Sequence, residues 1–286
     1  MSEKSIKLAH FSDMHIAGKQ DRRQQGYLEK LLTAIVKDGC GHIVITGDLV
    51  NSTNPSDWQI IKDILRKKGL YAWDKVTLIP GNHDLINLEE EARLYNALNP
   101  VVDGRKKRFR RKMLEFCRFF KELITGEEEV AGFPFIKVLK YGDITVSLVM
   151  VNTISHWMNI DNPLGARGYV NPGELKALSD SSVKEAIKGS FVIGVFHHAY
   201  KIYGSDSLID QAFDWTMELK NRQDLLQAMK KLNAELLLHG HFHRFQTYRA
   251  GGIQIVNGGS FSYNPRRYNE ITISGERSYT QRFVDI

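Results

Sequence analysis

Cysteine is scarce in this chain of 286 residues, which contains only Cys40 and Cys117. Neither lies in a Cys-x-x-Cys pair, and two thiols cannot build the disulfide framework of a small secreted protein. The first seven residues are mostly polar or charged and show no secretory signal. We therefore expect a protein of the reducing cytoplasm.

Long hydrophobic runs are missing as well. The apolar run at 144–151 is far shorter than the roughly 20 residues that a membrane-spanning helix needs, and it predicts a strand. The hydrophobic fraction of 42% and the charged fraction of 25% are ordinary for a globular chain that can bury a substantial core. The net charge of +6 favours an anionic partner, although much of the excess lies in one segment.

Three common catalytic signatures are absent. The sequence has no Gly-x-Ser-x-Gly, no Cys-x₅-Arg and no Gly-x₄-Gly-Lys-[Ser/Thr]. A serine or cysteine nucleophile and a nucleotide-driven motor are therefore not expected.

Apolar, β-branched runs alternate with helical patterns near the start of the chain. Strands are predicted at 6–11, 43–46 and 76–79, with helices at about 24–37 and 58–67 between them. This βαβαβ order predicts parallel strands with right-handed crossovers.

The second half continues this pattern and then changes. Strands are predicted at 144–152, 191–197 and 236–239, and a helix at 222–232. After residue 252 come three short strands that read as antiparallel, at 253–256, 268–273 and 279–285. Because no repeat or low-complexity linker interrupts the chain, we expect one catalytic domain over 1–286 with a basic helical insertion at about 99–135.

Five short polar fragments follow apolar runs and open onto turn residues. They are Asp13-Met14-His15, Gly47-Asp48, Gly81-Asn82-His83-Asp84, His197-His198 and Gly240-His241-Phe242-His243. Ligands of α/β proteins bind just beyond the carboxyl ends of the strands. Carboxylates, an amide oxygen and several imidazoles together suit a pair of first-row divalent metals.

The spacing within these fragments has a physical reason. Residues two apart on an extended segment point to the same side, so Asp13 and His15 can reach one ion. His241 and His243 have the same spacing, and they can serve one ion or two different ones. Taken singly, an Asp at a strand end is usually a cap or turn former. The order and context of the whole set favour a metal site.

Two adjacent histidines leave a choice open. His197 directly ends the predicted strand and is the favoured ligand, which leaves His198 beside the ligands or facing the substrate. His10 and His239 lie inside predicted strands, and we expect them to pack there without a role in the site.

The motifs Asp-x-His, Gly-Asp, Gly-Asn-His-Asp, a lone His and Gly-His-x-His, in this order, resemble those of the calcineurin-like metallophosphoesterase superfamily. The resemblance implies an α/β fold, a four-layer αββα sandwich with two mixed β-sheets and a dinuclear metal site at the strand C-terminal ends. It implies a first metal held by Asp13, His15 and His243, a second held by Asn82, His197 and His241, and a bridge through Asp48. It also implies that His83 is the general acid or stabilises the transition state.

The expected reaction is hydrolysis of a phosphodiester or pyrophosphate bond. Two divalent metals roughly 3.5–4 Å apart hold a bridging hydroxide that attacks phosphorus. The imidazole of His83 can be cationic near neutral pH and can protonate the leaving group, while Asp84 either orients that ring or caps the turn. Mn, Fe, Zn, Co and Ni all fit this nitrogen and oxygen donor set.

The motifs leave the substrate open. A cyclic nucleotide, a lipid-linked nucleotide and a nucleic acid are alternative substrates. A non-catalytic, metal-stabilised binding scaffold is the alternative from a different class, and the presence of all seven expected ligands and His83 weighs against it. Substrate-reading positions are expected in the insertion and at 200–215.

The insertion combines charge with an apolar stripe. Arg105–Lys112 places seven cations in eight positions, and a helical stripe consists of Phe109, Met113, Phe116, Phe120 and Leu123. One interpretation is a solvated surface helix packed on the core, and the other is a basic lid that meets phosphate, nucleic acid or an anionic membrane. We expect the stripe to face the core and the basic run to lie near the mouth of the site.

Overall fold

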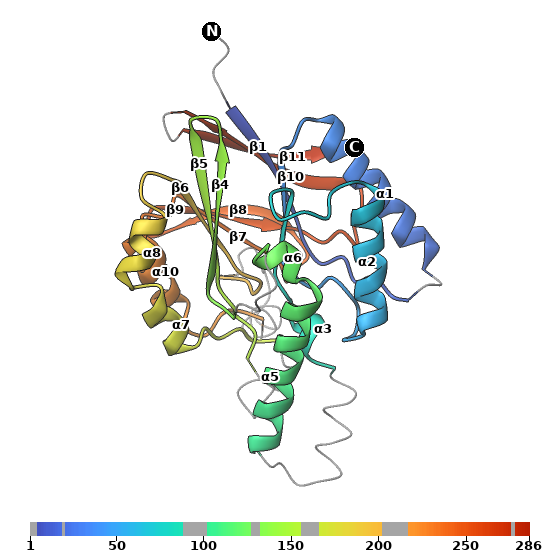
Figure 1. Cartoon of the computed structure of the whole chain (residues 1–286), viewed down its shortest axis with the longest axis horizontal. Coiled ribbons are helices and arrows are strands. Elements are labelled where there is room, and N and C mark those ends of the chain that lie inside the picture. The colour runs from blue at the N-terminus through green and yellow to red at the C-terminus, as the bar shows by residue number, and fades with distance from the viewer. Residues whose placement is uncertain are drawn as a thin grey trace, which may run out of the picture.

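Two mixed β-sheets lie between two groups of helices (Figure 1). The computed structural model describes residues 5–18, 21–87, 102–126, 132–155, 166–201, 217–275 and 278–286, except for the side chains of residues 102, 103 and 105. No helix among these residues is long and apolar enough to cross a membrane.

The first sheet has five strands in the order β11-β10-β1-β2-β3. Its parallel part consists of β1 (Ser5–Phe11), β2 (His42–Ile45) and β3 (Val76–Leu78). Helices α1 (Arg22–Lys37) and α2 (Pro55–Lys67) connect these strands, which confirms the predicted βαβαβ order. Strands β10 (Arg267–Ser274) and β11 (Tyr279–Asp285) extend the sheet in antiparallel fashion, also as predicted.

The second sheet has six strands in the order β4-β5-β6-β7-β9-β8. Its parallel strands are β5 (Ile144–Met150), β6 (Phe191–Val195), β7 (Leu236–His239) and β9 (Ile253–Gly258). Strands β4 (Phe135–Tyr141) and β8 (Phe245–Ala250) pair antiparallel at the two edges. The strand at 253–256 was expected to be antiparallel. This prediction is confirmed for the pairing of β9 with β8 and wrong for its pairing with β7, which is parallel.

Alternating side chains of β5 show how the layers are built. Val146, Leu148 and Met150 join the core between the sheets, whereas Val149 joins the core under the outer helices. Helix α10 (Arg222–Lys231) covers that outer face through buried residues such as Met229. Helices α1 and α2 cover the first sheet on the opposite side of the molecule (Figure 1). The result is the expected four-layer αββα sandwich.

Two short helices were not predicted. Helices α7 (Pro172–Ala177) and α8 (Ser181–Ala186) bury none of their residues, so they carry no helical apolar stripe. Each begins at a capping side chain, because Asn171 and Asp180 accept hydrogen bonds from the backbone two residues ahead.

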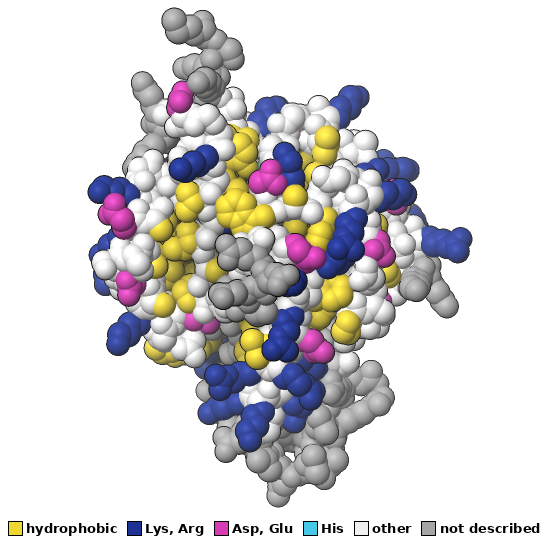
Figure 2. Space-filling view, viewed as in Figure 1, with side chains coloured by type: hydrophobic (Ala, Val, Ile, Leu, Met, Phe, Trp, Pro, Cys, Tyr) yellow, Lys and Arg dark blue, Asp and Glu magenta, His cyan; other side chains and the backbone are white. Residues whose placement is uncertain are grey.

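The segment that was expected to be an insertion forms helices α5 (Val102–Phe119) and α6 (Lys121–Ile124). The basic run at 105–112 lies inside α5. The apolar stripe faces the core as expected: Phe116, Phe120 and Leu123 are fully buried. In Figure 2, Lys and Arg side chains gather over the lower end of the molecule, where α5 lies.

A buried lysine attaches this insertion to both sheets. Lys137 of β4 is fully buried, and its ammonium donates to the carbonyl oxygens of Trp73, Val76 and Leu123 at 2.7–2.9 Å. Three acceptors satisfy all three N–H groups of the ammonium. Residue 137 thus links β4, β3 and α6.

Candidate metal centre

The polar fragments lie beyond the carboxyl ends of strands from both sheets. Asp13 and His15 follow β1, and Asp48 follows β2. Asn82 and His83 lie in α3 (Asn82–Leu85), the single turn after β3. His197 and His198 follow β6, and His241 and His243 follow β7. The site therefore lies where the two sheets bring their strand ends together.

The backbone is left-handed at five of these nine positions. The φ angles of Asp13, His15, Asp48, His241 and His243 lie between 42° and 72°. Non-glycine residues rarely adopt this region, and such strain concentrates where a function requires it. Backbone hydrogen bonds from Asp13 to Gly47 and from His15 to Asp48, both 3.0 Å, hold the first two turns together.

Close packing explains the glycines in the motifs. A Cβ atom at Gly81 would lie 2.1 Å from Oδ1 of Asp48. A Cβ atom at Gly240 would lie 1.8 Å from Oγ of Ser12 and 2.6 Å from Oδ2 of Asp13. A side chain at either position would displace the carboxylates that form the site.

Asp13, His15 and His243 form one group of potential metal ligands, with ligand atoms within 4.8 Å of one another. Nε2 of His243 lies 3.3 Å from Oδ1 of Asp13 and 3.2 Å from Nε2 of His15. This trio is the set that the resemblance assigns to the first metal.

Asp48, His197 and His241 form a second group. Nε2 of His197 lies 3.4 Å from Oδ2 of Asp48, 3.1 Å from Oδ1 of Asn82 and 3.2 Å from Nδ1 of His241. Nδ1 of His197 lies 2.7 Å from the carbonyl oxygen of Thr46, which can only accept a hydrogen bond. In the neutral ring, Nε2 therefore presents a lone pair to the oxygens of Asp48 and Asn82.

Lone pairs that converge on one point repel one another, and a cation at that point attracts all of them. Among the described residues, the buried atoms Nδ1 of His15 and Nε2 of His241 have no hydrogen-bond partner. Buried polar atoms are rarely left so, and a bound ion is one common explanation. The donor set thus fits divalent metal ions on the chemistry of its own atoms.

Asp48 connects the two groups. Its Oδ2 atom lies 3.4 Å from Nε2 of His197 and 3.8 Å from Nε2 of His15. Burial favours the neutral carboxyl, but the imidazole of His197 lowers the pKa of Asp48 well below its usual range. Burial likewise opposes the charge on His197, yet Asp48 raises the pKa of His197 to about 9. A single carboxylate faces ligands of both groups.

The structure places His197, and not His198, among the converging atoms. His198 is fully buried, and its Nδ1 lies 2.9 Å from Oγ1 of Thr153. Its ring centroid lies 4.6 Å from that of His241, so it packs beside the ligands. Burial lowers the pKa of His198 and keeps its ring neutral.

His83 lies at the edge of the site. A nitrogen of its ring belongs to a third close group with His15 and Asp48. Its Nδ1 lies 2.9 Å from the carbonyl oxygen of Asn51, so that backbone oxygen, rather than Asp84, orients the ring. Asp84 instead accepts hydrogen bonds from the backbone N–H groups of Gly81 and Leu49. The turn-capping alternative for Asp84 is therefore the one that the contacts support.

The sequence model for calcineurin-like phosphoesterases matches residues 6–245 of the chain. The chain belongs to the calcineurin-like phosphoesterase family. The match covers every fragment described above, and it confirms the resemblance drawn from the motifs. No curated protein matches the chain by sequence.

Solved structures of this phosphoesterase fold resemble the chain at low sequence identity. A dimetal phosphatase from Danio rerio is 11% identical, with a TM-score of 0.58 and 98% of each chain covered. GAP50, the anchor in the inner membrane complex of Plasmodium, is 13% identical, with a TM-score of 0.55 and coverage of 98% of this chain and 84% of that one. A purple acid phosphatase from yellow lupin seeds is 11% identical, with a TM-score of 0.54. The match covers 99% of this chain and 54% of the phosphatase. At these identities the likeness shows the fold.

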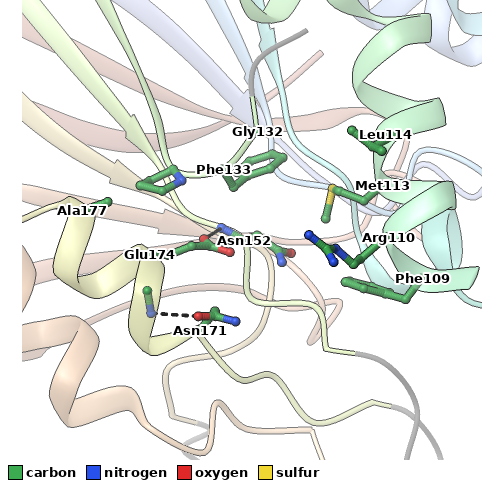
Figure 3. A pocket seen from close by; sticks show the side chains of 12 residues that line it. Phe109, Arg110, Met113, Leu114, Gly132, Phe133, Asn152, Asn171, Glu174 and Ala177 are labelled. Carbon is green, nitrogen blue, oxygen red and sulfur yellow. Dashed lines mark hydrogen bonds between the residues drawn. The ribbon is translucent and has the colours of Figure 1, made fainter. Parts of the chain in front are cut away.

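The candidate metal site is bordered by α5. Helix α5 packs against α3, which carries Asn82 and His83. A cavity of about 470 Å³ lies between α5 and α7, and Arg110 points across it toward Asn152 and Glu174 (Figure 3). Burial raises the pKa of Glu174 to about 7.

The predicted substrate-reading segment 200–215 lies outside the described residues from 202 onward.

His10 and His239 were expected to pack inside their strands, and both are buried there. His10 lies 3.0 Å from Oγ1 of Thr46, and His239 lies 2.9 Å from the hydroxyl of Tyr248. Both are buried, and neither belongs to a group of potential ligands among the described residues.

Proposed function

We propose that this chain hydrolyses a phosphodiester or pyrophosphate bond with the help of two divalent metal ions. The observation that carries the proposal is the position of Asp48, whose carboxylate faces His15 of one group and His197 of the other. Asp13, His15 and His243 would hold one ion. Asn82, His197 and His241 would hold the second, with Asp48 shared.

The chain's own residues set up the reaction around this pair. When bound, two such ions lower the pKa of a water to roughly 7 and neutralise the phosphoryl oxygens. The backbone N–H of His83 donates to Oδ1 of Asp48 at 2.9 Å and fixes the shared carboxylate. The Asn51 carbonyl accepts from Nδ1 of His83, which leaves Nε2 to carry a proton to the leaving oxygen.

The preference for a diester or pyrophosphate follows from His83. A proton donor beside the site matters most for a poor alkoxide leaving group. Cyclic nucleotides, lipid-linked nucleotides and nucleic acids all contain such bonds. The exposed cations of α5 would collect any of these anions, and Mn, Fe, Zn, Co or Ni would suit the ligands. We propose the cytoplasm as the compartment.

The test is hydrolysis of bis(p-nitrophenyl) phosphate by protein stripped of metal and then supplied with Mn²⁺. We expect turnover only with the metal, its loss in Asp48→Asn, and its retention in Asp63→Asn. Asp63 is an exposed carboxylate on α2 that serves as the matched control. A protein that binds two metals but turns over no phosphoester would instead be a metal-stabilised binding scaffold.

A further inference from the structure

An exposed tyrosine lies at the open edge of the candidate metal site. Tyr263 as a whole residue is 75% exposed. The centroid of its ring lies 5.1 Å from that of the His243 ring. The side chain of His243 is itself 33% exposed, against 0% for Asp13. The site is therefore open beside Tyr263, and most of this large residue is left to solvent.

The backbone beside Tyr263 is fixed to the site. The N–H of Ser262 donates to the carbonyl oxygen of Asp13 at 3.1 Å, and the N–H of Phe261 donates to that of Ser12 at 2.9 Å. On the other side, the N–H of Asn264 donates to the carbonyl oxygen of Ser260 at 2.9 Å. The exposed ring thus stands on a turn that is tied to a predicted metal ligand, which holds it in a defined place.

Tyr263 also lines a cavity of about 520 Å³ at the start of α1. Two guanidinium groups line it, those of Arg23 and Arg266. Arg23 donates to the hydroxyl of Tyr27 at 3.2 Å, which orients its side chain. Asp21 is the one carboxylate of the lining, and its Oδ1 accepts from the N–H of Gln24 at 3.1 Å as the cap of α1.

We infer that Tyr263 and this cavity bind the nucleoside part of a nucleotide substrate, whose phosphoester reaches the metal site past His243. The inference rests on the proposed function and narrows its substrate class. An exposed ring beside guanidinium groups is the combination that stacks a base and holds anionic oxygens. A lipid chain would meet charged and polar walls here, so the cavity favours a nucleotide over a lipid tail.

A pair of substrates isolates the nucleoside. The p-nitrophenyl ester of thymidine 5′-monophosphate and methyl p-nitrophenyl phosphate share the bond that breaks and the leaving group. We expect the native protein to prefer the thymidine ester in kcat/KM, and Tyr263→Ala to reduce this preference about tenfold, as for a lost stacking contact. Tyr263→Phe should keep it, because the ring remains.

The arginines have a matched control on the same helix. Arg23→Gln should reduce the preference for the thymidine ester, whereas Arg22→Gln should not, since Arg22 is exposed and lies outside the cavity lining. A preference that is absent in the native protein, or unchanged in both Tyr263→Ala and Arg23→Gln, overturns the inference. Hydrolysis of both esters at equal efficiency would leave the proposed function intact.

Binding gives a readout that does not depend on turnover. Calorimetry with metal-free protein should show tighter binding of thymidine 5′-monophosphate than of 2-deoxyribose 5-phosphate, with the difference lost in Tyr263→Ala. Equal affinities for the two probes count against the inference. Nucleotide binding by a protein that hydrolyses no phosphoester would support this subsite and refute the proposed function, so the two failures are distinguishable.

Discussion

The two groups of candidate ligands differ in their access to solvent. In the group of Asp48, His197 and His241, the first two side chains are at most 2% exposed and His241 as a whole is 3% exposed. In the group of Asp13, His15 and His243, the imidazoles are 11% and 33% exposed. The difference predicts that an ion held by Asp13, His15 and His243 would face incoming substrate and exchange more readily than an ion held by the group of Asp48, His197 and His241.

The largest effect is expected from the residue that the groups share. Asp48→Asn removes the charge that faces both, so it should abolish turnover and lower the content of both metals together. Asn82→Ala should also abolish turnover by weakening the buried group. Elemental analysis and the rate with an aryl phosphodiester measure both effects, and circular dichroism checks that the fold persists. Two bound metals and a near-native rate in Asp48→Asn would show that the carboxylate is not shared.

His83→Ala tests a residue that belongs to neither set of three. It should retain two metals and lose a factor of ~10²–10⁴ in rate, which is typical of a general acid. The loss should be smaller for a nitrophenyl leaving group than for an alkyl one, because the former leaves without a proton. Equal losses for both would contradict proton donation and favour stabilisation of transition-state charge.

The difference in exposure predicts an order of metal release. Chelator added to the two-metal protein should remove one ion quickly and the second slowly. His243→Gln should weaken the fast ion by about 10–100-fold or more and spare the slow one. Metal content against time, measured after rapid desalting, gives both phases. A single phase for both ions would remove the distinction between the groups.

The smallest effect concerns α5, which lies outside both groups. Replacing the exposed Lys106, Lys107 and Arg111 by serine should raise KM roughly tenfold at low ionic strength and flatten its dependence on salt. The kcat for a small aryl ester should change little. Flotation with anionic vesicles is the complementary measurement: strong binding that these substitutions abolish would replace substrate steering by a membrane role.

Much of the fold could be predicted from apolar runs, but two edge strands could not. Strand β4 contains Lys137, a charged residue that a sequence pattern assigns to the surface. It is fully buried because its ammonium donates to three carbonyl oxygens that only the folded chain brings together. Strand β8 is only partly buried along its length, so it lacks an apolar run. The direction of β9 depends on its pairing with β7, which no local pattern encodes.

The convergence of the candidate residues could be predicted from the sequence, but their geometry could not. The order of the motifs and their positions at strand ends identify the candidate residues from Asp13 to His243. Glycines lie beside the polar residues in these motifs because a side chain there would collide with the carboxylates. The orientation of His83 depends on the Asn51 carbonyl, a backbone atom that the side-chain sequence does not reveal. The position of Tyr263 depends on hydrogen bonds between residues about 250 apart in the chain, which only the fold brings together.

Anomalous diffraction from crystals grown with Mn²⁺ would locate the metal ions themselves. We expect two peaks roughly 3.5–4 Å apart, with Asp48 within bonding distance of both. Asp13, His15 and His243 should surround one peak, and Asn82, His197 and His241 the other. A single peak at full occupancy, or two peaks of which only one contacts Asp48, would contradict this expectation.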